Sequence, residues 1–199
     1  MRIVELIIEE DDENLFAGID AISIVEHPAI EENFVALNQQ KEYKLAEADT
    51  DKRLLTGALL VPNKTIYRKD GNDEYYIYFT RETVRKASEM FLMNGYQNNS
   101  TFEHKLELSG LSLVESWIVE DEVKDKSQIY DMDLPIGTWV GTMKVTNEEV
   151  WQDFVKTGKV KGFSIEGYFV EKSKKEELSK EIEAGLELLK IKQMILEAE

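Results

Sequence analysis

The order of the short apolar runs along this chain limits its possible folds more than any other feature of the sequence. Several runs are rich in β-branched and aromatic residues or alternate between apolar and polar positions, which is typical of strands. They span residues 2–9, 18–25, 52–62, 74–79, 111–119, 137–145 and 160–169. Helical spacing of apolar residues predicts only two helices among them, at 81–94 and 146–155. This order predicts an α+β fold, mainly a closed or strongly bent antiparallel β-barrel with helices packed outside.

The C-terminal segment has a different composition. Residues 172–199 are mostly helix-forming and charged, with Leu178, Ile182, Leu186 and Leu189 at spacings of three to four. We therefore expect one globular domain over 1–171 and a charged, amphipathic helical tail over 172–199. The tail is either a solvated helix or a surface for a partner helix.

Charge and composition exclude several classes of function. The net charge of -16 disfavours direct binding to nucleic acid. The chain has no cysteine, which excludes disulfides, thiolate metal sites and a cysteine nucleophile. Two histidines leave little material for a metal site, and no glycine pattern predicts a bound nucleotide or other cofactor. No apolar stretch reaches the length of a membrane span, so we expect a soluble, cytosolic protein.

One predicted strand carries a hydroxyl in an unusual setting. Residues 160–169 read Val-Lys-Gly-Phe-Ser-Ile-Glu-Gly-Tyr-Phe. Strand alternation places Ser164, Glu166 and Tyr168 on one face and the flanking apolar residues on the other. Gly167 interrupts the pattern, and a glycine in a strand often marks a bulge or a close approach of backbone or ligand. Ser164 is either an ordinary half-buried serine or a nucleophile.

A nucleophilic serine needs a base, and at neutral pH the chain offers only His27 and His104 for that role. His104 follows Asn98, Asn99 and Ser100 at a loop-to-strand junction, where polar side chains can face a groove. His27 lies between Glu26 and Pro28 at the end of a strand, where a surface role is more common. Either histidine could instead be a surface or packed residue without a catalytic role.

Several segments, taken in order, resemble one family. They are Asp-Ala-Ile-Ser-Ile-Val-Glu-His-Pro-Ala (20–29), Asn-Ser-Thr-Phe-Glu-His (99–104), Leu-Val-Glu-Ser-Trp-Ile-Val (113–119), Gly-Thr-Trp-Val-Gly (137–141), Glu-Val-Trp (149–151) and Gly-Phe-Ser-Ile-Glu-Gly (162–167). This set is similar to the XkdF-like phage serine proteases, relatives of the tailed-phage prohead proteases. The resemblance implies a β-barrel enzyme with a fold like that of the herpesvirus assembly proteases.

The resemblance also implies site residues. Ser164 matches the nucleophile and His104 the base. In the commoner prohead proteases, a Glu-Val-Ser-x-Val strand after the nucleophile supplies the acid. The similar run here, residues 21–25, is N-terminal, as though the chain were circularly permuted, and Ala21 occupies the place of the glutamate. We predict Asp20 as the third member, with Glu166 as the alternative; a dyad assisted by water is a further option.

The implied activity is that of a serine endopeptidase in phage procapsid maturation. It would cleave scaffold and major capsid protein by acyl transfer, with itself as a further substrate to consider, inside the procapsid assembling in the host cytoplasm. No cofactor, metal, nucleic acid or membrane is expected, and a homo-oligomer is left open. The alternative is a catalytically inactive capsid- or scaffold-associated protein of the same fold.

Overall fold

Three four-stranded sheets make up the computed structural model, which describes residues 2–8, 17–28, 35–36, 52–174, 176 and 180. The first sheet has the order β12 (Val170–Glu171), β1 (Arg2–Ile7), β6 (Asp73–Phe79) and β5 (Ile66–Asp70). The second has the order β3 (Val35–Ala36), β4 (Leu54–Leu60), β10 (Trp139–Val145) and β9 (Leu111–Ile118). The third has the order β11 (Gly162–Tyr168), β2 (Gly18–Val25), β7 (Ser100–Phe102) and β8 (Leu106–Leu108).

The sheet topology corrects two details of the sequence prediction, although the mainly β, α+β character is as expected. Over the described residues, none of the three sheets closes on itself, so the predicted barrel is not observed. Two pairings, β1 with β6 and β2 with β7, are parallel rather than antiparallel. Parallel neighbours require a long crossover, and here many residues separate the two strands of each pair. The order of the strands along the sequence does not reveal such distant pairings.

The predicted helix over 81–94 is confirmed as α1 (Arg81–Met93). The Thr80 hydroxyl caps it by accepting a hydrogen bond from the Thr83 backbone N–H at 3.3 Å. Its apolar face includes Val84, Ala87 and Phe91, which are fully buried. Phe91 meets the Trp139 ring edge to face with the centroids 5.6 Å apart, so α1 packs directly on β10.

Three shorter helical segments complete the described fold. The predicted helix over 146–155 is found as α2 (Glu148–Val150), capped by the Asn147 side chain, and it continues as a π-helical turn over Trp151–Val155. Two 3₁₀ turns lie at Tyr96–Asn98 and Lys126–Tyr130. Among the described residues, the structure contains no helix with the length and apolar character that crossing a bilayer requires.

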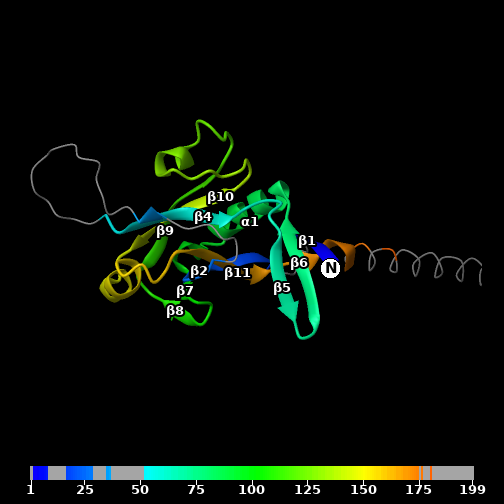
Figure 1. Ribbon diagram of the computed structural model, residues 1–199, viewed down its shortest axis with the longest axis horizontal. Helices are drawn as coiled ribbons and strands as arrows, with labels where there is room; N and C mark the ends of the chain where they lie inside the picture. Colours follow the sequence, from blue (N-terminus) through cyan, green and yellow to red (C-terminus); the bar gives the residue numbers. More distant parts are fainter. Residues whose placement is uncertain are drawn as a thin grey trace, which may run out of the picture.

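Figure 1 shows β2 and β11 running side by side through the middle of the molecule, and the β5–β6 hairpin standing beside them. One continuous set of buried apolar residues joins all three sheets, with Val4 on β1, Ile22 on β2 and Leu59 on β4 among its members. Of the predicted tail, residues 172–174, 176 and 180 are helical and exposed. The remaining tail residues lie outside the described part of the chain.

Candidate active site

Ser164 lies near the middle of β11, directly opposite Ser23 on β2. The preceding residue, Phe163, is fully buried in the core, whereas Ser164 is half-buried. The alternation predicted from the sequence holds as far as Glu166, where the register shifts in a bulge before Gly167. A Cβ at Gly167 would overlap the Gly18 carbonyl oxygen, so this glycine permits the close approach of β2.

His104 is held in a tight turn between β7 and β8. The Lys105 N–H donates to the Phe102 carbonyl at 3.0 Å, and the two central residues of the turn, Glu103 and His104, have φ of 52° and 56°. Positive φ at both central positions is the mark of a type I′ turn, which normally selects asparagine and glycine. Glutamate and histidine here cost conformational energy, a feature that often accompanies functional sites.

The buried hydroxyl of Ser23 fixes this turn to the sheet. Ser23 Oγ accepts a hydrogen bond from the His104 backbone N–H at 3.1 Å and donates to the Thr101 carbonyl at 3.4 Å. The residue has no exposed surface, so the hydroxyl depends on these partners. The cross-strand neighbour of Ser164 thus positions the backbone of His104.

Glu166 is the carboxylate that meets the His104 ring. His104 Nδ1 lies 3.2 Å from Glu166 Oε1, and the two side chains are 40% and 29% exposed. The Thr101 hydroxyl donates a short hydrogen bond to the same carboxylate oxygen. A carboxylate at Nδ1 favours the proton on that nitrogen and leaves Nε2 free to act as an acceptor. This is the relation of acid to imidazole that a serine hydrolase requires.

Asp20 is placed differently. It is exposed, and it is the extra residue of the bulge, because Ile19 and Ala21 take the partners on either side of it. Its backbone carbonyl accepts a hydrogen bond from Asn99 Nδ2 at 3.0 Å. Among the described residues, no ion pair joins Asp20 to His104. Asp20 lines a polar hollow of about 400 Å³ together with Glu166.

His27 is not part of this cluster. Its side chain is 85% exposed and its Nε2 lies 4.0 Å from the carboxylate of the adjacent Glu26. The strand-end position predicted for it is therefore a surface position, and of the two histidines His104 is the one brought to the Ser164 strand.

The hydroxyl of Ser164 makes no hydrogen bond to His104 within the part of the chain that the structure describes. Catalytic hydrogen bonds are often long in unbound enzymes and tighten when substrate binds. The described residues also contain no group of three or more histidine, aspartate or glutamate side chains that could hold a metal ion. The side chains that the structure brings to this site are a hydroxyl, an imidazole and a carboxylate.

Sequence reasoning missed Ser23 and Thr101. A usable signal for Ser23 was present, because it is the one hydroxyl within the otherwise apolar run 21–25, and a hydroxyl that is buried in such a run must find partners. Nothing in the local sequence indicates the partner of Thr101, since Glu166 lies 65 positions further along the chain.

Comparison with known protein families identifies a family that this chain matches. The model of a family described as "Putative phage serine protease XkdF" matches residues 42–172. This range contains Ser164, His104 and Glu166, whereas Asp20 precedes it. Comparisons with curated proteins and with solved structures gave no significant match.

Proposed function

The chain belongs to the XkdF family of phage serine proteases, and from this membership we propose that it is a serine endopeptidase with Ser164 as nucleophile and His104 as general base. The observation that carries the proposal is the contact of 3.2 Å between His104 Nδ1 and Glu166 Oε1. It orients an imidazole beside the strand that presents Ser164, in a chain whose family already indicates serine chemistry.

We propose Glu166 rather than Asp20 as the acid. Glu166 contacts the ring, and Asp20 makes no ion pair with it among the described residues. The strand register adds support, because Ala21 lies directly opposite Glu166. Ala21 occupies the place of the glutamate in the related prohead proteases, so the carboxylate here would come from the neighbouring strand at the same level of the sheet.

The mechanism would be acyl transfer in two steps. His104 Nε2 takes the proton of Ser164 Oγ as this oxygen attacks the peptide carbonyl, and the protonated imidazole then gives the proton to the leaving amine. Glu166 stabilises the imidazolium formed between these events. In the second step water, activated by His104, attacks the acyl-enzyme, the carboxylic acid product leaves, and the proton returns to Ser164 Oγ.

The phage context of the family supports a role in capsid maturation. The proposed substrates are the scaffold and major capsid proteins, and the chain itself is a further candidate. The proposed place of action is the interior of the procapsid in the host cytoplasm.

The experiment has a chemical and a biological part. A fluorophosphonate probe should label the wild-type protein at Ser164, whereas Ser164→Ala should not react and the matched exposed-serine variant Ser109→Ala should react normally. In co-expression with the cognate capsid and scaffold proteins, new termini mapped by intact mass should require Ser164. Cleavage that persists in Ser164→Ala would overturn the assignment of Ser164 as the nucleophile.

A second candidate function rests on a specific observation. The missing hydrogen bond between Ser164 and His104 in the described structure is the arrangement expected of a capsid-associated protein that kept the fold and lost the activity. Failure of the wild-type protein both to react with the probe and to cleave in assembled particles would favour this structural role.

A further inference from the structure

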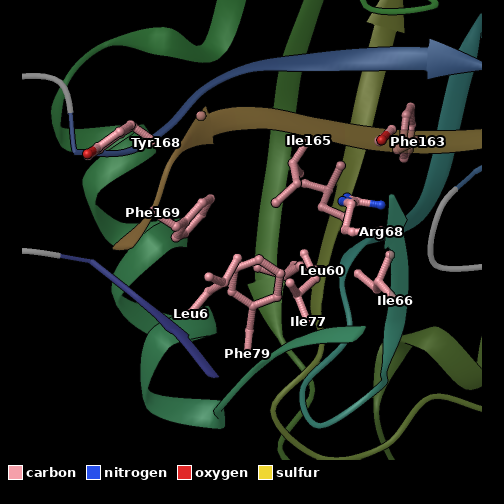
Figure 2. A pocket seen from close by; sticks show the side chains of 13 residues that line it. Leu6, Leu60, Ile66, Arg68, Ile77, Phe79, Phe163, Ile165, Tyr168 and Phe169 are labelled. Carbon is pink, nitrogen blue, oxygen red and sulfur yellow. The ribbon is translucent and has the colours of Figure 1, made fainter. Parts of the chain in front are cut away.

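The strand β11 divides its side chains between two faces of the third sheet. Figure 2 shows Ile165 pointing from this strand into an apolar pocket that Leu60 on β4 also lines. Successive side chains of a strand alternate between faces, so Ser164 and Glu166 project from the opposite face. On that face the Glu166 carboxylate meets His104, and the neighbouring strands β2 and β7 supply the residues around this contact.

Thr101 on β7 lies in the same row of the sheet as Ser164. Ser164 pairs with Ser23 on β2, and Ser23 pairs with Thr101, so the three residues follow one another across three adjacent strands. Directly paired residues project from the same face of a sheet. The Thr101 hydroxyl therefore shares a face with Glu166, and it donates a short hydrogen bond to Glu166 Oε1.

This hydrogen bond requires the Glu166 side chain to cross β2, which lies between β11 and β7. At the level of Glu166, β2 carries Ala21 as the direct partner. Neighbouring strands are about 4.8 Å apart, and the methyl side chain of Ala21 leaves the space that the longer glutamate needs. The carboxylate thus reaches β7, the strand that leads into the His104 turn.

A carboxylate in this place needs an anchor. The Glu166 side chain is 29% exposed, and together with Thr101 it lines the polar hollow of about 400 Å³. Water that entered such a hollow would compete for the carboxylate, and a glutamate side chain has several rotatable bonds to lose. Thr101 is suited to hold it, because this residue is 9% exposed and branching at its Cβ restricts χ1.

One carboxylate oxygen serves both partners. Glu166 Oε1 accepts from the Thr101 hydroxyl and lies 3.2 Å from His104 Nδ1, and a carboxylate oxygen has two lone pairs for two donors. The Thr101 carbonyl accepts from Ser23 Oγ at 3.4 Å, and the same oxygen of Ser23 accepts from the His104 N–H at 3.1 Å. Thr101 therefore contacts both the acid and the residue that anchors the turn of the base.

Resting on the proposed protease function, we propose that Thr101 is a positioning residue for the reaction. Its hydroxyl holds the Glu166 carboxylate at His104 Nδ1 and thereby keeps the neutral imidazole in the tautomer with the proton on Nδ1. In this tautomer Nε2 is free to take the proton of Ser164 Oγ. Thr101 would act through Glu166 and His104 rather than on the substrate itself.

NMR spectra that correlate the imidazole nitrogens with the ring protons report the tautomer of each histidine in the full-length protein without turnover. At about pH 8.5 imidazoles are mainly neutral, and His104 should show mainly the Nδ1–H form. Thr101→Val, which keeps the shape of the side chain and removes its hydroxyl, should shift His104 toward the Nε2–H form. Thr101→Ser should restore the wild-type signal. His27, whose side chain is 85% exposed, is the internal reference and should not respond.

The rate of reaction with a fluorophosphonate probe gives the second readout. Thr101→Val should lower the rate constant for labelling of Ser164 about tenfold, because the acid loses one charge-assisted hydrogen bond, and Thr101→Ser should recover most of the rate. Thr142→Val is the matched control, because Thr142 on β10 is 3% exposed and also donates to a carboxylate, at 3.0 Å from Glu115 Oε2. It should change neither readout.

The outcomes separate this proposal from the proposed function. A changed His104 tautomer in Thr101→Val, with no labelling of the wild-type protein, would support the part played by Thr101 and overturn the protease assignment. An unchanged tautomer in Thr101→Val would overturn the proposal, whatever the labelling rate. Equal effects of Thr101→Val and Thr142→Val on His104 would overturn it as well, because the effect would then be one of general stability. Should Thr101→Val fail to fold, Thr101→Ala against Thr101→Ser gives the same comparison.

Discussion

Ser23 and Ser164 face each other across the β2–β11 ladder, and Ser23 also binds the backbone N–H of His104 at 3.1 Å. One buried hydroxyl therefore links the strand of the proposed nucleophile to the turn of the proposed base. This link makes Ser23 a positioning residue, which acts through the placement of His104.

Replacing Ser23 by Ala should lower kcat with little change in KM. The His104 turn loses its anchor, and a displacement of about 1 Å in a catalytic group can reduce the rate about a hundredfold. The free energy of unfolding should fall by about 1–2 kcal/mol, because the part-buried N–H of His104 loses its acceptor. Ser88→Ala is the control: it removes a buried hydroxyl that bonds the Arg85 carbonyl at 2.7 Å in α1. A loss of stability in both variants with equal loss of activity would contradict the positioning role.

His104→Gly should abolish activity and at the same time preserve or increase stability. Glycine adopts positive φ without strain, and the left-handed conformation costs other residues about 1–2 kcal/mol. His104→Ala keeps the strain, so it should be the less stable of the two variants. Urea denaturation compares their free energies of unfolding, and probe labelling reports activity. If His104→Gly were the less stable variant, the turn strain would not be real.

The carboxylate partner can be tested by moving it across the ladder. Glu166→Ala should reduce kcat strongly, and adding Ala21→Glu should restore part of the loss, because positions 21 and 166 are direct partners with Cβ atoms about 4.5–5.5 Å apart in such pairs. Asp20→Ala is the matched control and should leave the rate almost unchanged. Full activity of Glu166→Ala alone would favour a dyad assisted by water.

A pH prediction follows from Glu115 on β9. The hydrogen bond from Lys126 holds the pKa of this carboxyl below its ordinary value, against the effect of burial, and the Thr142 hydroxyl adds to the lowering. A lowered pKa means that the contribution to stability is present above pH 4.5 and is lost as pH falls through the folded-state pKa. Because the side chain is 42% exposed, the contribution should be below about 1 kcal/mol.

Glu115→Gln should therefore reduce the free energy of unfolding slightly at pH 7, and the difference from the wild type should be smaller at pH 3. Chemical denaturation at both pH values gives the comparison, with the exposed Glu122→Gln as the matched control. If the variant and the wild type differed in free energy of unfolding by the same amount at pH 7 and pH 3, the charge of Glu115 would have no part in the effect.

Local sequence signals predicted the helices and strands well, but they did not predict which distant strands pair with each other. Thr80 and the apolar spacing up to Phe91 were enough to define α1, and Gly167 indicated the bulge where Gly18 approaches. The parallel pairing of β2 with β7 depends on residues almost 80 positions apart, for example Ser23 and Thr101. No local pattern encodes such a pairing, and over the described residues the expected barrel is not observed.

In the candidate site, too, some features could be predicted from the sequence and others depend on the fold. The two histidines of the chain reduced the choice of a base to His27 and His104, whereas Ser164 is one of many hydroxyl residues and was selected by its setting in the strand and by the family resemblance. The acid could not be chosen, because 40 acidic residues compete and only the fold shows which one meets the ring. The turn conformation of His104 was equally hidden, since Glu103 and His104 are not the residues that normally mark it.

The pairing partners of the two N-terminal strands have a consequence for synthesis. β1 pairs with β6 and β12, and β2 pairs with β7 and β11, so these two strands are synthesised well before the strands that they pair with. Contacts between such distant segments slow folding. Ser164 and the His104 turn are joined through β2 only after residue 164 has been made. A nascent chain therefore cannot assemble the site, and any activity would begin only after translation has passed β11.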